Sequence, residues 1–288
     1  MTALSLREHL SLAYRVSRPR FWFYLLGPFT VGCIWGADRY LDLLNPAFFI
    51  YFIYFLFPAN ILLYGVNDLY DYETDLLNPK KDEREYRVKQ GERDMLRRLI
   101  LAVLALSLVL VPLQGSNGER LIFLGFLSLS VFYSAPPLRF KARPLLDSSS
   151  NYLYALPGVF AYYQVAGALP PTPVLAAAFA HTFAMHLFSA VPDVVFDAST
   201  GVRTTAVFIG ERMALMLCLA SWSALAFIAL SLGQGSPLSF LPLVYPLLVA
   251  GVLALNRPVA SVYWFYPIIN VGLGGLLFLM KAAVTPWS

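Results

Sequence analysis

The sequence predicts an all-α polytopic membrane protein, a bundle of about nine transmembrane helices around a central apolar chamber. Of its 288 residues, 58% are hydrophobic and only 13% are charged, whereas roughly a quarter of the residues in a soluble domain are charged. The apolar residues form continuous runs close to the ~20 residues that cross a bilayer as a helix. A membrane barrel would instead show alternating segments of ~10 residues. We therefore expect one membrane domain covering residues 1–288.

The elements follow one another in a regular order. Residues 1–20 form an amphipathic basic stretch without an apolar core, so we expect them to lie on the cytoplasmic membrane face and not to act as a signal peptide. The short outer loops GALPPTP and GQGSPLS are uncharged and separate the fifth run from the sixth and the seventh from the eighth. The predicted spans, of which the fourth is short, are 21–38, 46–67, 97–114, 120–135, 150–169, 173–192, 213–232, 238–255 and 262–281.

The basic residues lie almost entirely on one side of the predicted membrane. Of the 21 Lys and Arg residues, all but Arg39, Arg120 and Lys281 fall in the N-terminal stretch or in the loops after the second, fourth, sixth and eighth runs. Cytoplasmic loops carry such an excess of positive charge. We therefore expect an integral protein of the cell (inner) membrane, with a cytoplasmic N-terminus and active site and an outer C-terminus. The alternation requires an odd number of spans, which supports nine.

An acidic cluster follows the second apolar run, where a membrane helix should be ending. Asn67, Asp71 and Asp75 stand at positions i, i+4 and i+8, and Asp68 lies three residues before Asp71. A continued helix would carry these side chains on one face. Like charges on one face repel each other unless a divalent cation lies among them. The alternative is a solvated loop that begins at the membrane surface.

A second acidic pair follows the sixth run. Asp193 and Asp197 are again four residues apart. Two oxygen-rich clusters of this kind suit Mg²⁺, which prefers carboxylates, waters and substrate phosphate over a cage made by the protein alone. The sequence therefore predicts Mg²⁺ as the cofactor. The alternative for this pair is the capping of a helix that begins beside Pro192.

Basic residues accompany both acidic clusters on the same membrane side. Arg139, Lys141 and Arg143 lie in the loop YSAPPLRFKARPLLDSSSN, and Arg203 follows the second acidic pair. Such residues are expected to bind the outer oxygens of a diphosphate that Mg²⁺ bridges to the carboxylates. We assign diphosphate binding to Arg139, Lys141 and Arg203, and attribute Arg143 to the charge bias of the loop.

Other polar and aromatic residues receive secondary roles. Asp147 is expected to bond the basic residues of its loop or to cap the fifth span. His181 and His186 are five residues apart in the sixth span, so packing or hydrogen bonding is expected and not metal binding. Cys33 and Cys218 lie in apolar runs and are expected to be buried thiols. The 22 Phe, 17 Tyr and 5 Trp residues offer ring faces that can stabilise a carbocation in a dry site.

These motifs resemble those of one known family. Asn67-Asp68-x-x-Asp71-x-x-x-Asp75 and Asp193-x-x-x-Asp197 are similar to the two aspartate-rich motifs of the UbiA superfamily of intramembrane prenyltransferases. The resemblance implies that an allylic prenyl diphosphate binds through Mg²⁺, that its carbon–oxygen bond ionises, and that a lipophilic acceptor attacks the prenyl cation. The implied metal ligands are Asn67, Asp68, Asp71, Asp75, Asp193 and Asp197. The implied catalytic residues are Asp71, Asp75, Asp193 and Asp197. Membrane lipids are the expected surroundings, and no nucleic-acid partner is expected.

Within the family, three segments look most like the lycopene elongase branch. They are NDLYDYETDLLNPKK, RFKARPLLDSSSN and YWFYPIINVGLGG, and the stretch Asn78-Pro79-Lys80-Lys81 weighs most. Members of that branch add dimethylallyl units to the ends of a carotenoid, sometimes with hydration. The resemblance therefore implies dimethylallyl diphosphate as donor and a lycopene-type carotenoid as acceptor.

Three alternatives stay open. The acceptor is a quinone precursor or another aromatic compound, the chain is a divalent-cation transporter, or it is a structural protein that only binds an isoprenoid. A transporter should place polar groups near the membrane midplane. The last three runs carry few such groups beyond Ser, Gly and Asn270.

Overall fold

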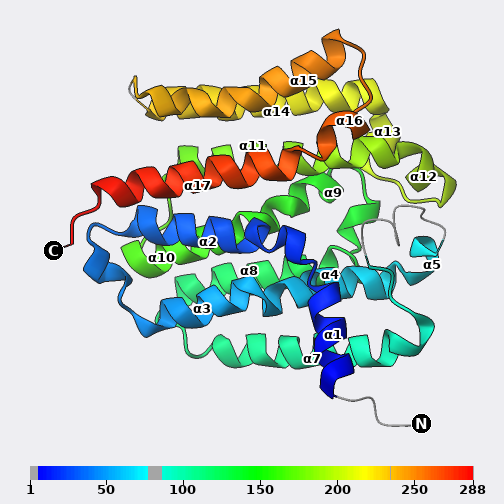
Figure 1. Ribbon diagram of the computed structural model, residues 1–288, viewed down its shortest axis with the longest axis horizontal. Helices are drawn as coiled ribbons and strands as arrows, with labels where there is room; N and C mark the ends of the chain where they lie inside the picture. Colours follow the sequence, from blue (N-terminus) through cyan, green and yellow to red (C-terminus); the bar gives the residue numbers. More distant parts are fainter. Residues whose placement is uncertain (1–5, 77–85, 234, 288) are drawn as a thin grey trace. The chain divides into compact units, whose positions relative to one another are not determined.

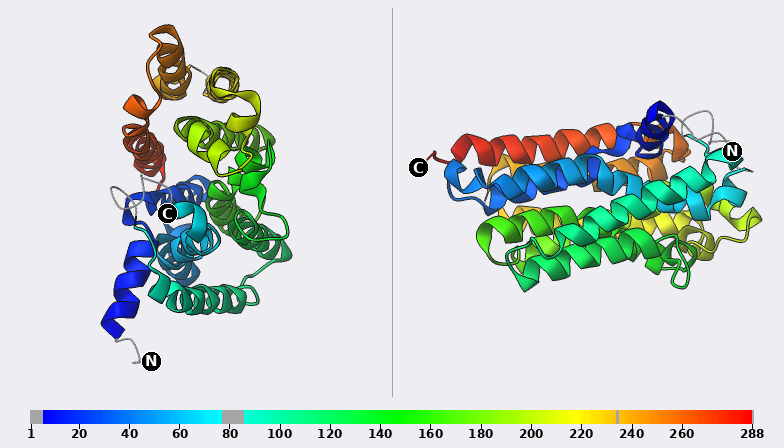
Figure 2. Two further views of the ribbon diagram at one scale, coloured as in Figure 1. Left: turned by 90° about the vertical axis from the view of Figure 1, so that its right-hand side faces the viewer. Right: turned by 90° about the horizontal axis from the view of Figure 1, so that it is seen from below.

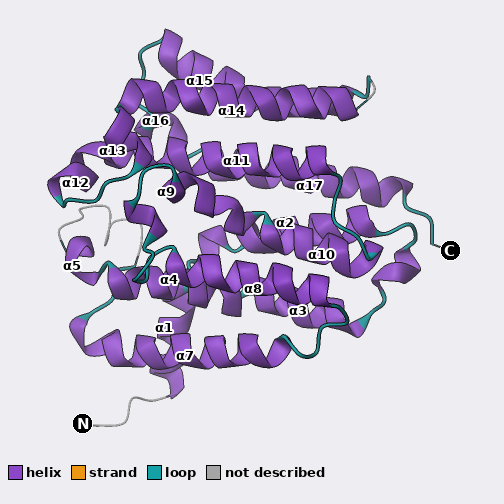
Figure 3. Ribbon diagram, turned by 180° about the vertical axis from the view of Figure 1, so that it is seen from behind, coloured by secondary structure: helices purple, strands orange, loops and turns teal. Residues whose placement is uncertain are grey.

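The computed structural model describes residues 6–76, 86–233 and 235–287. Within these ranges the chain is helical and contains no strand (Figure 3). It forms two compact units, the first made of residues 1–138, 156–168 and 278–288 and the second of residues 139–155 and 169–277. The prediction of a single domain stays a prediction.

Unit 1 is a bundle of helices with one helix set across it. In Figure 1 the long helices lie side by side, and the left view of Figure 2 shows them end-on and α1 from the side. Its helices are α1 (Leu6–Val16), α2 (Phe23–Gly36), α3 (Pro46–Leu56), α4 (Pro58–Tyr70), α5 (Tyr72–Asp75), α7 (Arg93–Leu110), α8 (Asn117–Phe132) and α10 (Leu156–Ala166).

Unit 2 contains the remaining helices. The long helix α11 packs against α14, and α14 against α15 (Figure 1). The last helix, α17, begins in unit 2 and ends in unit 1. The bounds are α9 (Leu146–Ser149), α11 (Thr172–Ala190), α12 (Val194–Ser199), α13 (Thr205–Ile209), α14 (Glu211–Leu232), α15 (Val244–Ala254), α16 (Ala260–Tyr263) and α17 (Tyr266–Val284).

The second predicted span is built from two helices that meet at Pro58. Proline has no backbone N–H and clashes with the preceding turn, so α3 ends at Leu56 and α4 begins at Pro58. The carbonyls at the break would otherwise lose their donors. The buried amide of Asn60 donates to the carbonyls of Phe55 and Leu56, each at 3.0 Å. The break is thus satisfied internally, as backbone at membrane depth must be.

Helices α2 and α10 cross at a pair of glycines in unit 1. A Cβ at Gly32 would lie 2.1 Å from the carbonyl oxygen of Gly158, so only glycine allows this approach. A second long-range contact in the same unit is made by Tyr40. Its backbone amide donates a hydrogen bond to the Pro286 carbonyl at 2.9 Å, and its hydroxyl donates one to the Ala282 carbonyl at 2.6 Å. These two bonds therefore join the segment after α2 to residues 282–286.

Aromatic side chains form the core of each unit. In unit 1 the rings of Phe55, Phe123 and Phe160 pack on one another, with centroids 5.5–6.3 Å apart. In unit 2 Trp222 stacks on Tyr245 at 5.2 Å. All five side chains are buried. These rings therefore stabilise the packing within each unit.

The count of nine spans is not confirmed. Each predicted range contains a helix, but only five helices among the described residues are long and apolar enough to cross a membrane. They are Pro46–Tyr70, Thr172–Ser199, Glu211–Leu232, Pro237–Ala254 and Tyr266–Val284. Others are too short, such as α2 with 14 residues and α10 with 11. The orientation of the termini stays a prediction.

Candidate active site

The first acidic cluster lies at the end of α4 in unit 1 and keeps its helical register. Asp71 separates α4 from α5, with φ −100° and ψ 3°. The helical hydrogen bonds nevertheless continue, from the Asp71 amide to the Asn67 carbonyl at 2.9 Å and from the Asp75 amide to the Asp71 carbonyl at 2.7 Å. The predicted i, i+4, i+8 spacing is therefore present as one slightly distorted helical segment.

Asp68 is held by an ion pair that the sequence analysis missed. Its carboxylate is 2% exposed, and Oδ1 lies 2.7 Å from Nη2 of Arg18. The Arg18 guanidinium also lies over the ring of Tyr64, 4.8 Å from its centroid. In the sequence, Arg18 is one of several basic residues of the N-terminal stretch. A buried carboxylate needs a countercharge, so the sequence indicates that Asp68 has a basic partner. It does not indicate which of the several arginines is that partner.

The other members of the first cluster differ in burial. The Asn67 side-chain amide donates to the hydroxyl of Ser134 at 3.1 Å, which fixes the amide at the end of α4. Asp71 is buried, whereas Asp75 is half-buried. The carboxylates thus become more accessible along the chain.

The second acidic pair lies in unit 2 at the junction of α11 and α12. Asp193 occupies the position before α12, but its side chain makes no capping bond to that helix. Asp197 lies one turn later, and both side chains are half-buried. Because no capping bond is formed, the simple structural alternative for Asp193 loses its support.

The basic loop of unit 2 forms a tight turn. The Ala142 amide donates to the Arg139 carbonyl at 3.1 Å, and the Arg143 amide donates to the Phe140 carbonyl at 3.0 Å. Arg139 has the unusual φ of 41°. Arg139 and Lys141 are half-buried, whereas Arg143 and Arg203 are exposed.

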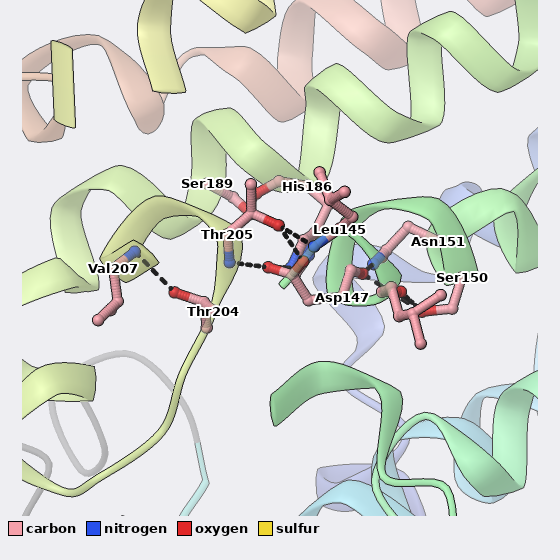
Figure 4. A network of polar contacts seen from close by, with 10 residues as sticks. Leu145, Asp147, Ser150, Asn151, His186, Ser189, Thr204, Thr205 and Val207 are labelled. Carbon is pink, nitrogen blue, oxygen red and sulfur yellow. Dashed lines mark hydrogen bonds and ion pairs between the residues drawn. The ribbon is translucent and has the colours of Figure 1, made fainter. Parts of the chain in front are cut away.

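Asp147 is the centre of a buried polar network behind this loop (Figure 4). Its Oδ2 accepts from the Thr205 amide at 2.8 Å, and its Oδ1 accepts from the Thr205 hydroxyl. The Thr205 hydroxyl in turn accepts from the Leu145 amide at 2.6 Å. The expectation that Asp147 bonds the basic side chains of its loop or caps the fifth span is therefore replaced by a bond to the segment after Arg203.

The environment of Asp147 keeps its carboxyl ionised. Complete burial by itself would raise its pKa, but His186 and the two donors of Thr205 outweigh burial and hold the pKa below the usual value of a carboxyl group. Nε2 of His186 lies 3.7 Å from Oδ2, too far for a hydrogen bond. The other histidine, His181, accepts a bond from Nε1 of Trp222 at 3.3 Å, as the packing role predicted.

Each acidic cluster by itself offers only part of the ligand set of a divalent cation such as Mg²⁺. In the described part of the chain, no three His, Cys, Asp or Glu residues gather closely enough to form a metal site. The donors in each cluster are all oxygen atoms, which suits Mg²⁺ completed by water and phosphate. The stretch Asn78-Pro79-Lys80-Lys81 lies outside the described residues.

Comparison of the sequence with known families gives a match over nearly the whole chain. The profile of the UbiA prenyltransferase family matches residues 25–283. A lycopene elongase/hydratase of Haloferax volcanii is 43% identical over 266 residues, which cover 92% of this chain and 86% of that protein. A lycopene elongase/hydratase of Haloarcula japonica is 40% identical over 282 residues, covering 97% and 95%.

The fold has a solved counterpart. A UbiA homolog from Archaeoglobus fulgidus, bound to DMAPP and Mg²⁺, superimposes with a TM-score of 0.66 at 21% identity. The superposition covers 92% of this chain and 98% of that one. At this identity the likeness concerns the fold.

Proposed function

The chain belongs to the UbiA prenyltransferase family and is a membrane prenyltransferase, and from this premise we propose that it transfers dimethylallyl units to the ends of a lycopene-type carotenoid. The observation that carries the acceptor is the identity of 40–43%, over almost the full chain, with two lycopene elongase/hydratases. UbiA homologs of the same fold have been solved with DMAPP and with GPP, each with Mg²⁺, which supports an allylic diphosphate as the class of donor, and the resemblance to the lycopene elongase branch favours the dimethylallyl unit. The family assignment favours this enzyme over the cation-transporter alternative.

The proposed magnesium ligands are the carboxylate side chains of both motifs and the side-chain amide oxygen of Asn67. Bound magnesium would supply the positive charge that makes diphosphate a good leaving group. The proposed ligands provide only oxygen, as that ion prefers. They are Asn67, Asp68, Asp71, Asp75, Asp193 and Asp197.

The basic residues of unit 2 are the proposed partners of the diphosphate itself. Arg139, Lys141 and Arg203 bind its outer oxygens and stabilise the charge that grows as the carbon–oxygen bond breaks. The bonding electron pair leaves with the diphosphate. A terminal double bond of the acceptor then attacks the allylic carbon, and the new cation loses a proton or takes up water with loss of a proton.

Expression in a lycopene-producing host tests the proposal. The expected result is the appearance of carotenoids longer than lycopene by one or two five-carbon units, detected by chromatography and mass spectrometry. In purified form the same extension should require dimethylallyl diphosphate and Mg²⁺ and should stop with a chelator. Unchanged pigment, together with prenylation of a quinone precursor, would overturn the acceptor assignment.

A further inference from the structure

We propose that Asp147 is a positioning residue for diphosphate binding, which holds the basic loop Arg139–Arg143 and the turn after Arg203 in one fixed arrangement. The inference rests on the proposed function, because it assumes that these basic residues bind the diphosphate. The pair of hydrogen bonds between Asp147 and Thr205 supports the inference, and neither residue belongs to an aspartate-rich motif. All groups involved belong to unit 2.

The first step of the argument is that one carboxylate joins two distant segments. Both oxygens of Asp147 bond Thr205, one through its amide and one through its hydroxyl, and that hydroxyl also receives the Leu145 amide. The partners are 58 and 60 residues apart in sequence. Figure 4 shows the three residues meeting in one cluster.

The second step is that both segments lead directly to basic residues. On one side the Asp147 amide donates to the Arg143 carbonyl at 2.9 Å, so the turn that contains Arg139 and Lys141 ends against Asp147. On the other side Arg203 lies two residues before Thr205. Thr204 lies between Arg203 and Thr205, and its hydroxyl accepts a hydrogen bond from the Val207 amide at 3.2 Å, which fixes the start of α13. A shift of the Asp147 carboxylate would therefore move both sets of basic residues.

The third step is that the network constrains an unfavourable backbone. Leu145 has φ 69° and ψ −39°, a region that non-glycine residues rarely adopt and that persists only where surrounding contacts hold it. The bond from its amide to Thr205 is such a contact. Asp147 and Thr205 are both 0% exposed, so water cannot replace the lost bonds if either side chain is removed.

A set of four variants separates positioning from general stability. Thr205→Val removes the hydroxyl at nearly constant size, and Thr205→Ser keeps it. Asp147→Asn removes the charge. Ser148→Ala is the matched control, because Ser148 is the next residue, is equally buried, and its hydroxyl has no hydrogen-bond partner among the described residues.

The measurements are the KM for dimethylallyl diphosphate, the KM for the carotenoid, kcat and the thermal midpoint. Thr205→Val and Asp147→Asn should raise the KM for the diphosphate by about tenfold or more, as expected for the loss of a bond to a charged group. The KM for the carotenoid should stay within about twofold. Thr205→Ser and Ser148→Ala should resemble the wild type.

Two results would overturn the proposal. One is a wild-type KM for the diphosphate in Thr205→Val, and the other is an equal rise of both KM values with a lower thermal midpoint, which marks a structural role only. If Asp147→Asn does not fold, the Thr205 pair still decides.

Binding of inorganic pyrophosphate with Mg²⁺ distinguishes this proposal from the function itself. If the wild type transfers no prenyl group, yet Thr205→Val binds pyrophosphate more weakly than Thr205→Ser and Ser148→Ala, the positioning role stands and the proposed function falls. Equal affinity in all four variants would overturn the positioning role.

Discussion

Two buried carboxylates, Asp68 in unit 1 and Asp147 in unit 2, are stabilised in different ways. Asp68 is paired with the positive charge of Arg18, whereas Asp147 receives two neutral donors from Thr205 and has His186 beside it. Removing a charged partner leaves a buried charge uncompensated, while removing a neutral donor weakens one bond of several. The contrast assigns Arg18 mainly to the stability of unit 1 and Thr205 mainly to the geometry of the basic loop.

The largest effect on this comparison should come from Arg18→Met. The buried carboxylate of Asp68 then loses its countercharge, at a cost of about 3–5 kcal/mol in the free energy of unfolding. The apparent thermal midpoint in detergent measures this. The double variant Arg18→Met/Asp68→Asn should recover part of the loss, and an unchanged midpoint in the single variant would show that the pair contributes nothing.

Loss of one aspartate from either acidic cluster tests the catalytic role proposed for that cluster. Asp71→Ala or Asp193→Ala should lower kcat by about 10²–10³-fold, the scale seen when one electrostatic contact to a reacting group is removed. Glu73→Ala is the control, since Glu73 is an exposed carboxylate of the same segment. Wild-type transfer by Asp71→Ala would contradict its assignment as a magnesium ligand.

Helix packing within unit 1 sets the surroundings of Asp68, and Gly32→Ala tests that packing. The added methyl group collides with the Gly158 carbonyl, so we expect a loss of about 1–3 kcal/mol in stability. Gly27→Ala in the same helix meets open space and should leave the thermal midpoint unchanged. Equal midpoints for the two variants would mean that α2 and α10 lie farther apart.

The smallest effect is the pH dependence of stability that Asp147 contributes. Because the folded pKa of Asp147 lies below the ordinary ~3.9 of an aspartate, the unfolded chain takes up this proton at a higher pH than the folded chain. The stabilisation is therefore present above about pH 4 and is lost as the pH falls through the folded pKa. Thermal midpoints between about pH 5 and pH 3 should fall less in Asp147→Asn than in the wild type or Ser148→Ala.

The sequence was sufficient for features that repeat locally. The helical register of Asn67, Asp71 and Asp75 follows from residue spacing alone, and the break at Pro58 follows from a missing N–H. The all-helical class follows from the low charge and the long apolar runs.

The sequence alone does not identify which residues pair over long distances in the chain. Arg18 and Asp68 are 50 residues apart, and Asp147 and Thr205 are 58 apart, so only tertiary packing selects them. Hydropathy also overestimates the length of the α-helices, because it reports the apolar character of a segment and not its backbone conformation. The apolar run at 150–169 begins with a 3₁₀ segment, Ser150–Tyr154, before α10, and the run at 238–255 has Pro237–Leu243 before α15.

The hydrogen bonds from Tyr40 to Ala282 and Pro286 have a consequence for biosynthesis. Tyr40 leaves the ribosome early, whereas Ala282 follows it by 242 residues. All of unit 2 is therefore translated before these bonds within unit 1 can form. A stop codon placed just before Ala282 should leave the membrane insertion of every earlier helix intact. The bundle of unit 1 would then lack the two hydrogen bonds from Tyr40.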